Sequence, residues 1–219
     1  MTDRTTSFRD RREAGNALAE RLLPFAGPDT LVVGLARGGV PVAAAVARRL
    51  VSPLDILVVR KIGTPMSSEL ALGAVTAGGT RLIDTATMQR LGISQSWVEW
   101  AASEEQRRAQ RQERQFRAFS PAPSFRDRTV IVVDDGLATG ATMRLALRVI
   151  KQHKPRRLIA AVPVAAPEAL RVLEFEADQV VCLQMPESFQ AVGEYYQDFT
   201  QVEDATVVEL LNTAARKAS

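Results

Sequence analysis

Short apolar stretches rich in Val, Ile and Leu recur along the chain and alternate with stretches of helical periodicity. The apolar stretches lack the strict alternation of a half-exposed strand, which predicts strands buried on both faces. They cover residues 30–35, 54–59, 130–133, 158–162 and 179–183. Helical patterns follow several of them, at residues 40–50, 141–153 and 167–175. Strand followed by helix, repeated, predicts an α/β fold with a parallel sheet, whose ligands bind in the loops after the strands.

Two regions lie outside this repeat. An amphipathic helix over residues 8–23, with Leu18 and Leu22 on its apolar face, precedes the first strand. About 70 residues separate the second strand from the third, more than one crossover needs, so this insertion carries structure of its own. Within it, residues 69–75 and 80–83 are predicted to pair as a hairpin.

A long polar helix is predicted after the hairpin. Ser96 and Glu99 form a capping box that opens it, and the helix runs to about residue 119. Its predicted ion pairs join glutamates to arginines four residues further on, Glu104 with Arg108 and Glu113 with Arg117. This pattern favours a solvated or subunit-contacting helix, and an RNA-binding arm is the alternative.

Composition restricts the class of protein. A chain of 219 residues predicts one domain over residues 1–219. The net charge of +3 is too small to predict a nucleic-acid partner, and no stretch is apolar for long enough to span a membrane. A single cysteine, Cys182, excludes an intrachain disulfide framework and a cysteine-rich zinc site. We expect a soluble cytoplasmic protein.

The segment TVIVVDDGLATGATM, residues 129–143, carries the strongest chemical signal. A buried strand ends in Asp134 and Asp135, and a loop of small residues then opens a helix. Small residues let the backbone approach a ligand, and the amides at a helix N-terminus favour an anion. The loop lacks the Gly-Lys-Ser/Thr of a P-loop, which disfavours a nucleoside-triphosphate hydrolase. The residues predicted to hold a phosphate are Ala138, Thr139, Gly140, Ala141 and Thr142.

Two carboxylates beside a phosphate site need a hydrogen-bond donor or a cation between them and the anion. Vicinal ribose hydroxyls are such donors, and Mg²⁺ is a cation that prefers oxygen ligands. Asp134 and Asp135 therefore indicate a sugar phosphate, with a metal oriented mainly through ribose hydroxyls or water. The alternative is a helix-capping aspartate beside a solvated one.

A second small-residue loop follows the first strand. In GLARGGVPVA, residues 34–43, Arg37 lies among small residues just before a helix, which suits a second phosphate or a pyrophosphate. The residues of this candidate pyrophosphate site are Ala36, Arg37, Gly38 and Gly39. A simple tight turn is the alternative. The second strand is expected to place Arg60 and Lys61 at the same sheet edge as further pyrophosphate contacts, followed by a mobile lid at residues 63–68.

These residues resemble the phosphoribosyl-pyrophosphate (PRPP) motif of type I phosphoribosyltransferases. The motif reads DDxxxTGxT at residues 134–142, and the order of the loops agrees over about residues 31–199. The resemblance implies a five-stranded parallel core flanked by helices and a small hood, for which residues 184–200 are the candidate. Residues 62–126 are expected to form a flexible-loop, hairpin and long-helix insertion. The resemblance also implies transfer of ribose 5-phosphate from PRPP to a nitrogenous base or related acceptor, with Mg²⁺ as cofactor and release of pyrophosphate.

The resemblance leaves the acceptor open. Residues 185–199 are similar to the hood of hypoxanthine-guanine enzymes, but Ala177 replaces a purine-reading lysine and Ala138 replaces a proton-accepting carboxylate. These departures disfavour a 6-oxopurine acceptor. The aromatic residues that are candidates for stacking on a base, with core packing as the alternative, are Phe189, Tyr195 and Tyr196.

The resemblance also implies the role of each residue. Arg37 and Lys61, with Mg²⁺, stabilise the charge that accumulates on pyrophosphate as an oxocarbenium-like ribose forms. Asp134 and Asp135 hold the ribose hydroxyls, and no covalent nucleophile is needed. A non-catalytic protein that binds PRPP and regulates a partner is the alternative function. The expected partners are PRPP and a small-molecule acceptor, without nucleic acid or membrane, and the expected assembly is a homodimer.

Overall fold

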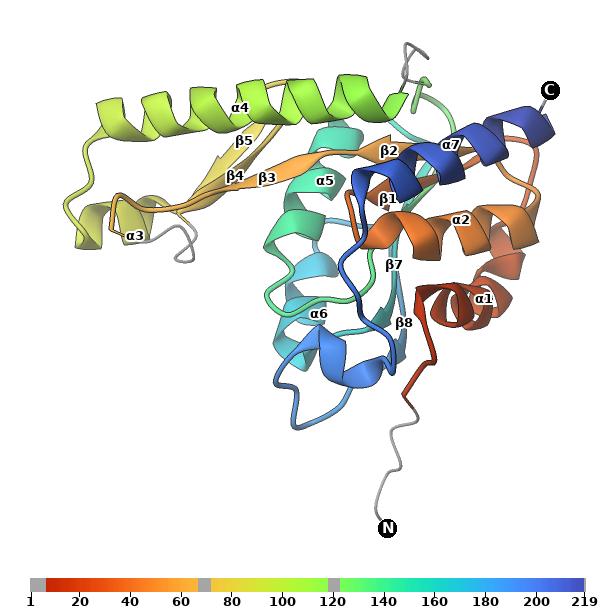
Figure 1. Cartoon of the computed structure of the whole chain (residues 1–219). Coiled ribbons are helices and arrows are strands. Elements are labelled where there is room, and N and C mark those ends of the chain that lie inside the picture. The colour runs from red at the N-terminus through yellow and green to blue at the C-terminus, as the bar shows by residue number, and fades with distance from the viewer. Residues whose placement is uncertain (1–6, 67–71, 118–122, 219) are drawn as a thin grey trace.

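Five parallel strands form the central sheet of the computed structural model, which describes residues 7–66, 72–117 and 123–218. Their spatial order is β2-β1-β6-β7-β8 (Figure 1). Their bounds are β1 Thr30–Leu35, β2 Leu54–Leu57, β6 Thr129–Val133, β7 Arg157–Val164 and β8 Gln179–Gln184. The predicted α/β fold with a five-stranded parallel core is confirmed.

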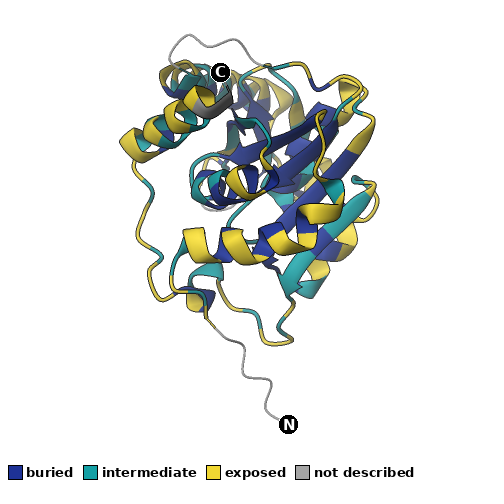
Figure 2. Ribbon diagram, turned by 90° about the vertical axis from the view of Figure 1, so that its right-hand side faces the viewer, coloured by how far each residue is buried: buried dark blue, intermediate teal, exposed yellow. Residues whose placement is uncertain are grey.

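Helices cover both faces of this sheet. Their bounds are α1 Arg11–Leu22 and α2 Gly39–Leu50 on one face, and α5 Ala141–Gln152 and α6 Pro167–Leu173 on the other. Neighbouring residues of a strand point to opposite faces, so Val32 and Ile131 pack with α1 and α2, whereas Leu31 and Val130 pack with α5 and α6. The inner strands β1, β6 and β7 are therefore buried, while the helices keep exposed outer faces (Figure 2). The prediction of a fully buried strand is wrong for β8, which lies at the edge of the sheet and is mostly half-buried.

The helices nearest the two chain ends, α1 and α7 Asp204–Ala218, both pack against α2. The predicted N-terminal helix begins at Arg11, because the Asp10 side chain caps it by accepting a hydrogen bond from the Glu13 amide at 2.7 Å. A short 3-10 turn, η1 Leu23–Phe25, follows it. Another such turn, η2 Val192–Tyr195, lies in the segment predicted as a hood and precedes α7. Among the described residues, no helix is long and apolar enough to cross a bilayer.

The insertion between β2 and β6 builds a second, antiparallel sheet in the order β3-β4-β5. The bounds of its strands are β3 Val59–Ile62, β4 Gly73–Thr76 and β5 Arg81–Ile83. The predicted hairpin is confirmed as β4 and β5, although its residues 69–71, like residues 67 and 68 of the expected lid, lie outside the described chain. The predicted second strand is wrong beyond Leu57, because the chain leaves the parallel sheet at Val58 and pairs elsewhere.

A short helix, α3 Thr85–Arg90, and the long α4 Gln95–Arg117 complete the insertion. α4 lies along the second sheet, and α5 contacts the same sheet (Figure 1). Ala101 and Ala102 of α4 pack with Ile62 and Val75, so one face of this helix is buried rather than solvated. The buried residues of α4 are Val98, Ala101, Ala102, Ala109 and Phe116, and the polar sequence conceals this face because three of the five are alanines.

Local contacts at α4 differ in part from those predicted. Ser94 accepts a hydrogen bond from the Trp97 amide at 3.3 Å, so the predicted capping box at Ser96 and Glu99 is wrong. The expected pair of Glu113 with Arg117 is present at 2.8 Å. The other expected pair is wrong, since Glu104 pairs with Arg107, and Arg108 pairs with Glu105 three residues away.

Candidate functional site

The two small-residue loops meet at the switch point of the central sheet. β1 and β6 are neighbours, paired from Thr30 with Thr129 to Gly34 with Val133. The crossovers leave them in opposite directions, from β1 to β2 and from β6 to β7. Ligands of α/β sheets bind at such a point, outside the carboxyl ends of the strands. The topology therefore supplies the edge at which the sequence predicts a site.

Glycines let the two loops touch. A Cβ added to Gly38 would lie 2.1 Å from Oδ2 of Asp135, and one added to Gly39 would lie 2.6 Å from the carbonyl oxygen of Val133. Neither position has room for a side chain, so the loop after β1 lies directly against the two aspartates. The structure thus places the two predicted anion loops side by side.

The loop after β6 leads into the N-terminus of α5. Gly140 precedes the helix in a left-handed conformation, with φ of 72°, and as a glycine it offers no side chain to cap the helix. Ala138 and Thr139 are exposed, and the Thr139 hydroxyl accepts a hydrogen bond from the Ala141 amide at 3.4 Å. This turn offers amide and hydroxyl donors at the positive end of the helix dipole, which is the arrangement that an anion needs.

Asp134 and Asp135 form a half-buried acid pair between the loops. Asp134 Oδ1 accepts a hydrogen bond from the Asp135 amide at 2.9 Å. Burial raises the pKa of Asp134 well above its usual range, and the adjacent charge of Asp135 raises it further. Burial also raises the pKa of Asp135, while the hydrogen bond and charge of Arg11 partly offset that rise. Strongly perturbed carboxylates beside an anion loop mark a candidate functional site.

Sequence reasoning misses one residue of this site, Arg11 of α1. Its Nε donates to Asp135 Oδ2 at 2.8 Å, and its Nη1 donates to the Thr200 carbonyl at 2.9 Å. The guanidinium also lies over the Phe199 ring, 4.0 Å from the ring centroid. One signal was available, a cation in the first turn of a helix, where the helix dipole favours anions.

The candidate acceptor residues belong to an aromatic cluster. Tyr195 and Tyr196 are 7 % and 6 % exposed, and Phe189 stacks on Tyr195 with ring centroids 5.7 Å apart. Tyr196 donates its hydroxyl to the Asp135 carbonyl at 2.6 Å, and burial raises the pKa of Tyr196, so it stays a donor. The structure therefore favours the core alternative for both tyrosines, because burial leaves little ring surface for a base.

The predicted cations differ in their placement. Arg37 lies in the loop after β1, with its Nη1 3.5 Å from Oδ1 of Asp204, the first residue of α7. Arg60 and Lys61 lie within β3 of the second sheet, so their expected position at the edge of the core sheet is wrong. Arg60 Nε is paired with Glu105 Oε2 of α4 at 2.6 Å, whereas Lys61 is exposed.

The acid pair also bears on metal binding. No group of three or more His, Cys, Asp or Glu side chains in the described part of the chain could hold an ion. Two carboxylates beside a phosphate loop nevertheless fit Mg²⁺, which keeps water ligands and binds through one or two carboxylates together with substrate phosphates. Asp134 and Asp135 are the residues that could hold such an ion along with a substrate.

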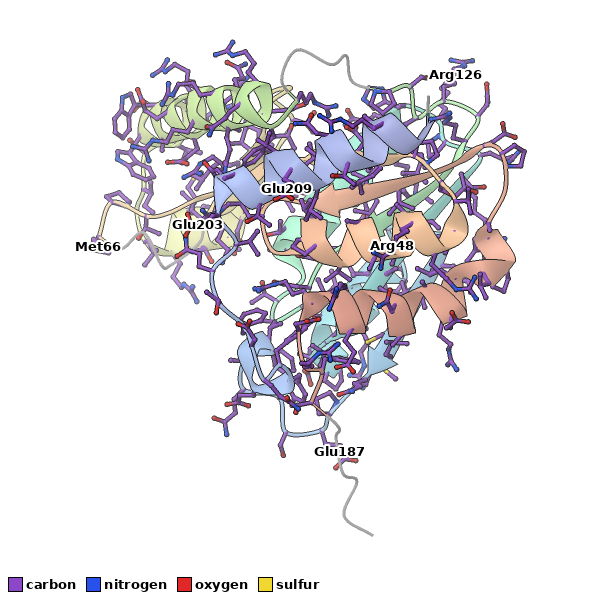
Figure 3. All side chains as sticks on the ribbon, turned by 45° about the vertical axis from the view of Figure 1, so that its right-hand side comes forward. Arg48, Met66, Arg126, Glu187, Glu203 and Glu209 are labelled. Atoms are coloured by element: carbon purple, nitrogen blue, oxygen red, sulfur yellow. The ribbon has the colours of Figure 1, made fainter. Side chains whose placement is uncertain are left out.

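A groove of about 570 Å³ lies away from the acid pair, where α7 runs beside α2 (Figure 3). Small and apolar residues line most of it, and Arg12 and Arg48 are its charged residues. None of the predicted site residues lines this groove. The site is therefore located by the switch point and the acid pair rather than by the size of a hollow.

Comparison with known proteins agrees with this geometry. Residues 11–199 match the family model described as the phosphoribosyl transferase domain. The chain belongs to this family. A relative from Mycobacterium tuberculosis strain H37Rv, which carries a phosphoribosyl transferase name, is 39 % identical over 209 residues. The match covers 95 % of this chain and 47 % of the relative, so the chain spans about half the length of the curated relatives it matches.

Solved structures extend the comparison to the fold. The crystal structure of TT1426 from Thermus thermophilus has 44 % sequence identity and a TM-score of 0.80, covering 94 % of this chain and 98 % of that one. A shorter stretch of 62 residues, 28 % of this chain and 30 % of the relative, is 36 % identical to a uracil phosphoribosyltransferase of Aquifex aeolicus. The predicted type I phosphoribosyltransferase family and fold are confirmed.

The family match includes Arg11, which lies outside the sequence motif at residues 134–142. The matched phosphoribosyl transferase region begins at Arg11 and ends at Phe199. These two residues are in contact, since the Arg11 guanidinium lies over the Phe199 ring. The first and last residues of the matched region thus meet beside the acid pair.

Proposed function

We propose that this chain transfers the 5-phosphoribosyl group of PRPP to a nitrogenous base or a related acceptor and releases pyrophosphate. The observation that carries the proposal is the contact of the two anion loops at Gly38 and Asp135. PRPP has a phosphate at one end, a pyrophosphate at the other and a hydroxylated ring between them. The site presents matching groups in the same order: the phosphate loop after β6, the acid pair and the loop after β1.

Binding of the ribose phosphate involves the loop after β6. The residues whose amides and hydroxyls would anchor the 5-phosphate are Ala138, Thr139, Gly140, Ala141 and Thr142. Asp134 and Asp135 would accept hydrogen bonds from the ribose hydroxyls. Both sets of contacts lie away from the reacting carbon, so their binding energy can hold the ring in position while the bond to pyrophosphate breaks.

Stabilisation of the leaving group involves the loop after β1. As the bond from the anomeric carbon breaks, the ribose gains positive charge and the pyrophosphate gains negative charge. Arg37, with the backbone of Ala36, Gly38 and Gly39, would stabilise that negative charge more in the transition state than in the ground state. Lys61, exposed on β3, is the second proposed cation, and we leave out Arg60 because Glu105 is its partner.

Mg²⁺ is the proposed cofactor. When bound with PRPP, the ion would neutralise part of the pyrophosphate charge and help to orient it. Asp134 and Asp135 would contribute to holding it, mainly through the ribose hydroxyls or water. Removal of Mg²⁺ with EDTA is therefore expected to abolish pyrophosphate release.

The deciding experiment supplies Mg²⁺, PRPP and a panel of nitrogenous acceptors and measures pyrophosphate release. Release that depends on one acceptor supports the transferase and names its substrate. Calorimetric binding of PRPP without release for any acceptor supports the alternative, a non-catalytic PRPP-binding regulatory protein. Absence of PRPP binding would contradict both functions.

The assigned contacts can be tested separately by calorimetry. Asp135→Asn and Thr139→Val should each weaken PRPP binding by about 1–3 kcal/mol, because each removes a charge-assisted or buried hydrogen bond. Thr213→Val is the matched control, since Thr213 is exposed on α7. Unchanged titrations for both site variants would remove these assignments.

Further expectations belong to this proposal. Residues 1–219 act as one domain, PRPP and a small-molecule acceptor are its partners, and neither a nucleic acid nor a membrane is one. The protein works in the cytoplasm as a homodimer. Light scattering of the purified chain tests the assembly.

A further inference from the structure

We propose that Arg11 is a positioning residue, which holds the Asp135 carboxylate in the orientation that accepts the ribose hydroxyls of PRPP. The inference rests on the proposed function and adds a residue from outside its sequence motif. Arg11 lies 124 residues before Asp135 in the chain and comes from the first turn of α1. Its contact with the acid pair exists only through the tertiary fold.

Asp135 is held at three points. Arg11 Nε donates to its Oδ2 at 2.8 Å, the Tyr196 hydroxyl donates to its carbonyl at 2.6 Å, and its amide donates to Asp134 Oδ1 at 2.9 Å. The last two contacts fix the backbone. The contact with Arg11 acts on the carboxylate itself, so it decides where the carboxylate oxygens lie beside Gly38.

Arg11 is itself held in place. Its Nη1 donates to the Thr200 carbonyl at 2.9 Å, its guanidinium lies 4.0 Å from the Phe199 ring centroid, and its side chain is 11 % exposed. A planar guanidinium that uses Nε and Nη1 for different partners cannot turn without losing one of them. A lysine ammonium keeps the charge but lacks this fork.

A purely structural role for Arg11 is the competing explanation. A buried ion pair is weak evidence for stability, because the loss of hydration of both charges offsets their attraction. Arg11 lies on a carboxylate that adjoins a second carboxylate and the loop after β1, where orientation bears on ligand binding. Its position therefore indicates a role in binding, which a double-mutant cycle can separate from stability.

The first test titrates Mg²⁺ and PRPP into four proteins: the wild type, Arg11→Met, Arg11→Lys and the control Arg12→Met, which changes the exposed neighbour on α1. Arg11→Met should weaken PRPP binding about tenfold or more, the size expected for a lost charge-assisted hydrogen bond. Arg11→Lys should restore part of the affinity, and Arg12→Met should leave it unchanged. Unchanged or tighter binding in both Arg11 variants overturns the inference.

The second test repeats Arg11→Met in an Asp135→Asn background. If Arg11 acts through the Asp135 carboxylate, its substitution costs little further affinity once that carboxylate is gone. A full additional loss in the double variant means that Arg11 affects binding independently of the Asp135 carboxylate, and overturns the inference. If the wild type itself fails to bind PRPP, the proposed function has failed; if it binds PRPP and Arg11 has no effect, the inference alone has failed.

Discussion

Two adjacent carboxylates with little access to solvent oppose folding when they are charged. Burial raises the pKa values of both Asp134 and Asp135, so the folded chain binds their protons more tightly than the unfolded chain does. The contribution of the pair to stability is therefore greatest at low pH and is lost as the pH rises from the ordinary value of 3.8 through the raised values. At neutral pH the pair lowers the free energy of unfolding.

Asp134→Asn should therefore stabilise the ligand-free protein at pH 7 and weaken PRPP binding. The amide oxygen can still accept the hydrogen bond from the Asp135 amide, while the buried charge is removed. Each kcal/mol gained should raise the Tm by about 2–4 °C in a chain of this length, and the gain should shrink towards pH 4. Thermal unfolding from pH 4 to 8 measures it, with Glu187→Gln, at an exposed carboxylate, as control. A lower Tm for Asp134→Asn at pH 7 would contradict this account of the acid pair.

A substitution at Gly38 tests whether the two loops need to be in contact. The added methyl of Gly38→Ala would meet Asp135 Oδ2 at 2.1 Å, so the Asp135 carboxylate or the loop after β1 must shift, at a cost of about 1–3 kcal/mol in stability and with weaker PRPP binding. Gly27→Ala is the matched control, because its nearest neighbour would be 3.7 Å away. Equal Tm and equal PRPP affinity for the two variants would show that the loops do not need this close approach.

Among the elements, α4 depends on a buried ion cluster at its carboxyl end. Arg117 donates to both oxygens of Asp55 at 2.6 and 3.1 Å, to Glu113 at 2.8 Å and to the Ile56 carbonyl at 2.9 Å. Burial raises the pKa of Asp55, although the charge of Arg117 opposes the rise. The cluster joins α4 to β2 close to the point where the chain turns from the parallel sheet into β3.

Arg117→Met should destabilise the protein by about 3–5 kcal/mol, because it leaves the Asp55 carboxylate buried without its cation. Arg114→Met, on the exposed side of the same helix, should stay within about 0.5 kcal/mol of the wild type. Urea unfolding of both variants measures the difference. Similar losses in the two proteins would mean that the cluster does not anchor α4.

Across the whole molecule, the segment before α1 pairs with the segment after η2. The Phe8 amide donates to the Tyr195 carbonyl at 2.8 Å, and the Gln197 amide donates to the Phe8 carbonyl at 2.8 Å. The Phe8 ring lies 5.7 Å from the Tyr196 ring, whose hydroxyl reaches the Asp135 carbonyl. Regions from both ends of the chain therefore support the loop that carries the acid pair.

Phe8→Ala should loosen the pairing of the segment before α1 with the segment after η2, while leaving the central sheet intact. The backbone pairing remains possible, but loss of the ring removes about 1–2 kcal/mol of apolar burial. Hydrogen exchange should become faster at the amides of Gln197 and Asp198 and stay unchanged in β6. Phe175→Ala is the control, since that ring is 84 % exposed. Protection at Gln197 and Asp198 equal to that of the wild type would show that the Phe8 ring does not hold these two segments together.

The local pattern of apolar, small and acidic residues was enough to predict the core strands and the loop that carries the acid pair. Buried strands appear as short apolar runs, and the bounds of β1 follow from its run without change. The acid pair and the small-residue turn after β6 are contiguous in sequence, so their chemistry could be predicted before any contact was known. The family and the parallel core followed from these features, because strand, loop and helix N-terminus are formed by neighbouring residues.

Only the tertiary structure decided which distant residues share the site. The apolar run continues past Val58, and pattern alone does not reveal that Arg60 and Lys61 enter a second sheet. Arg11 has the sequence context of surface charge, yet packing of α1 against the sheet places it on Asp135, 124 residues away. Periodicity reports which face of an element is buried, whereas a contact between elements depends on how the whole chain packs.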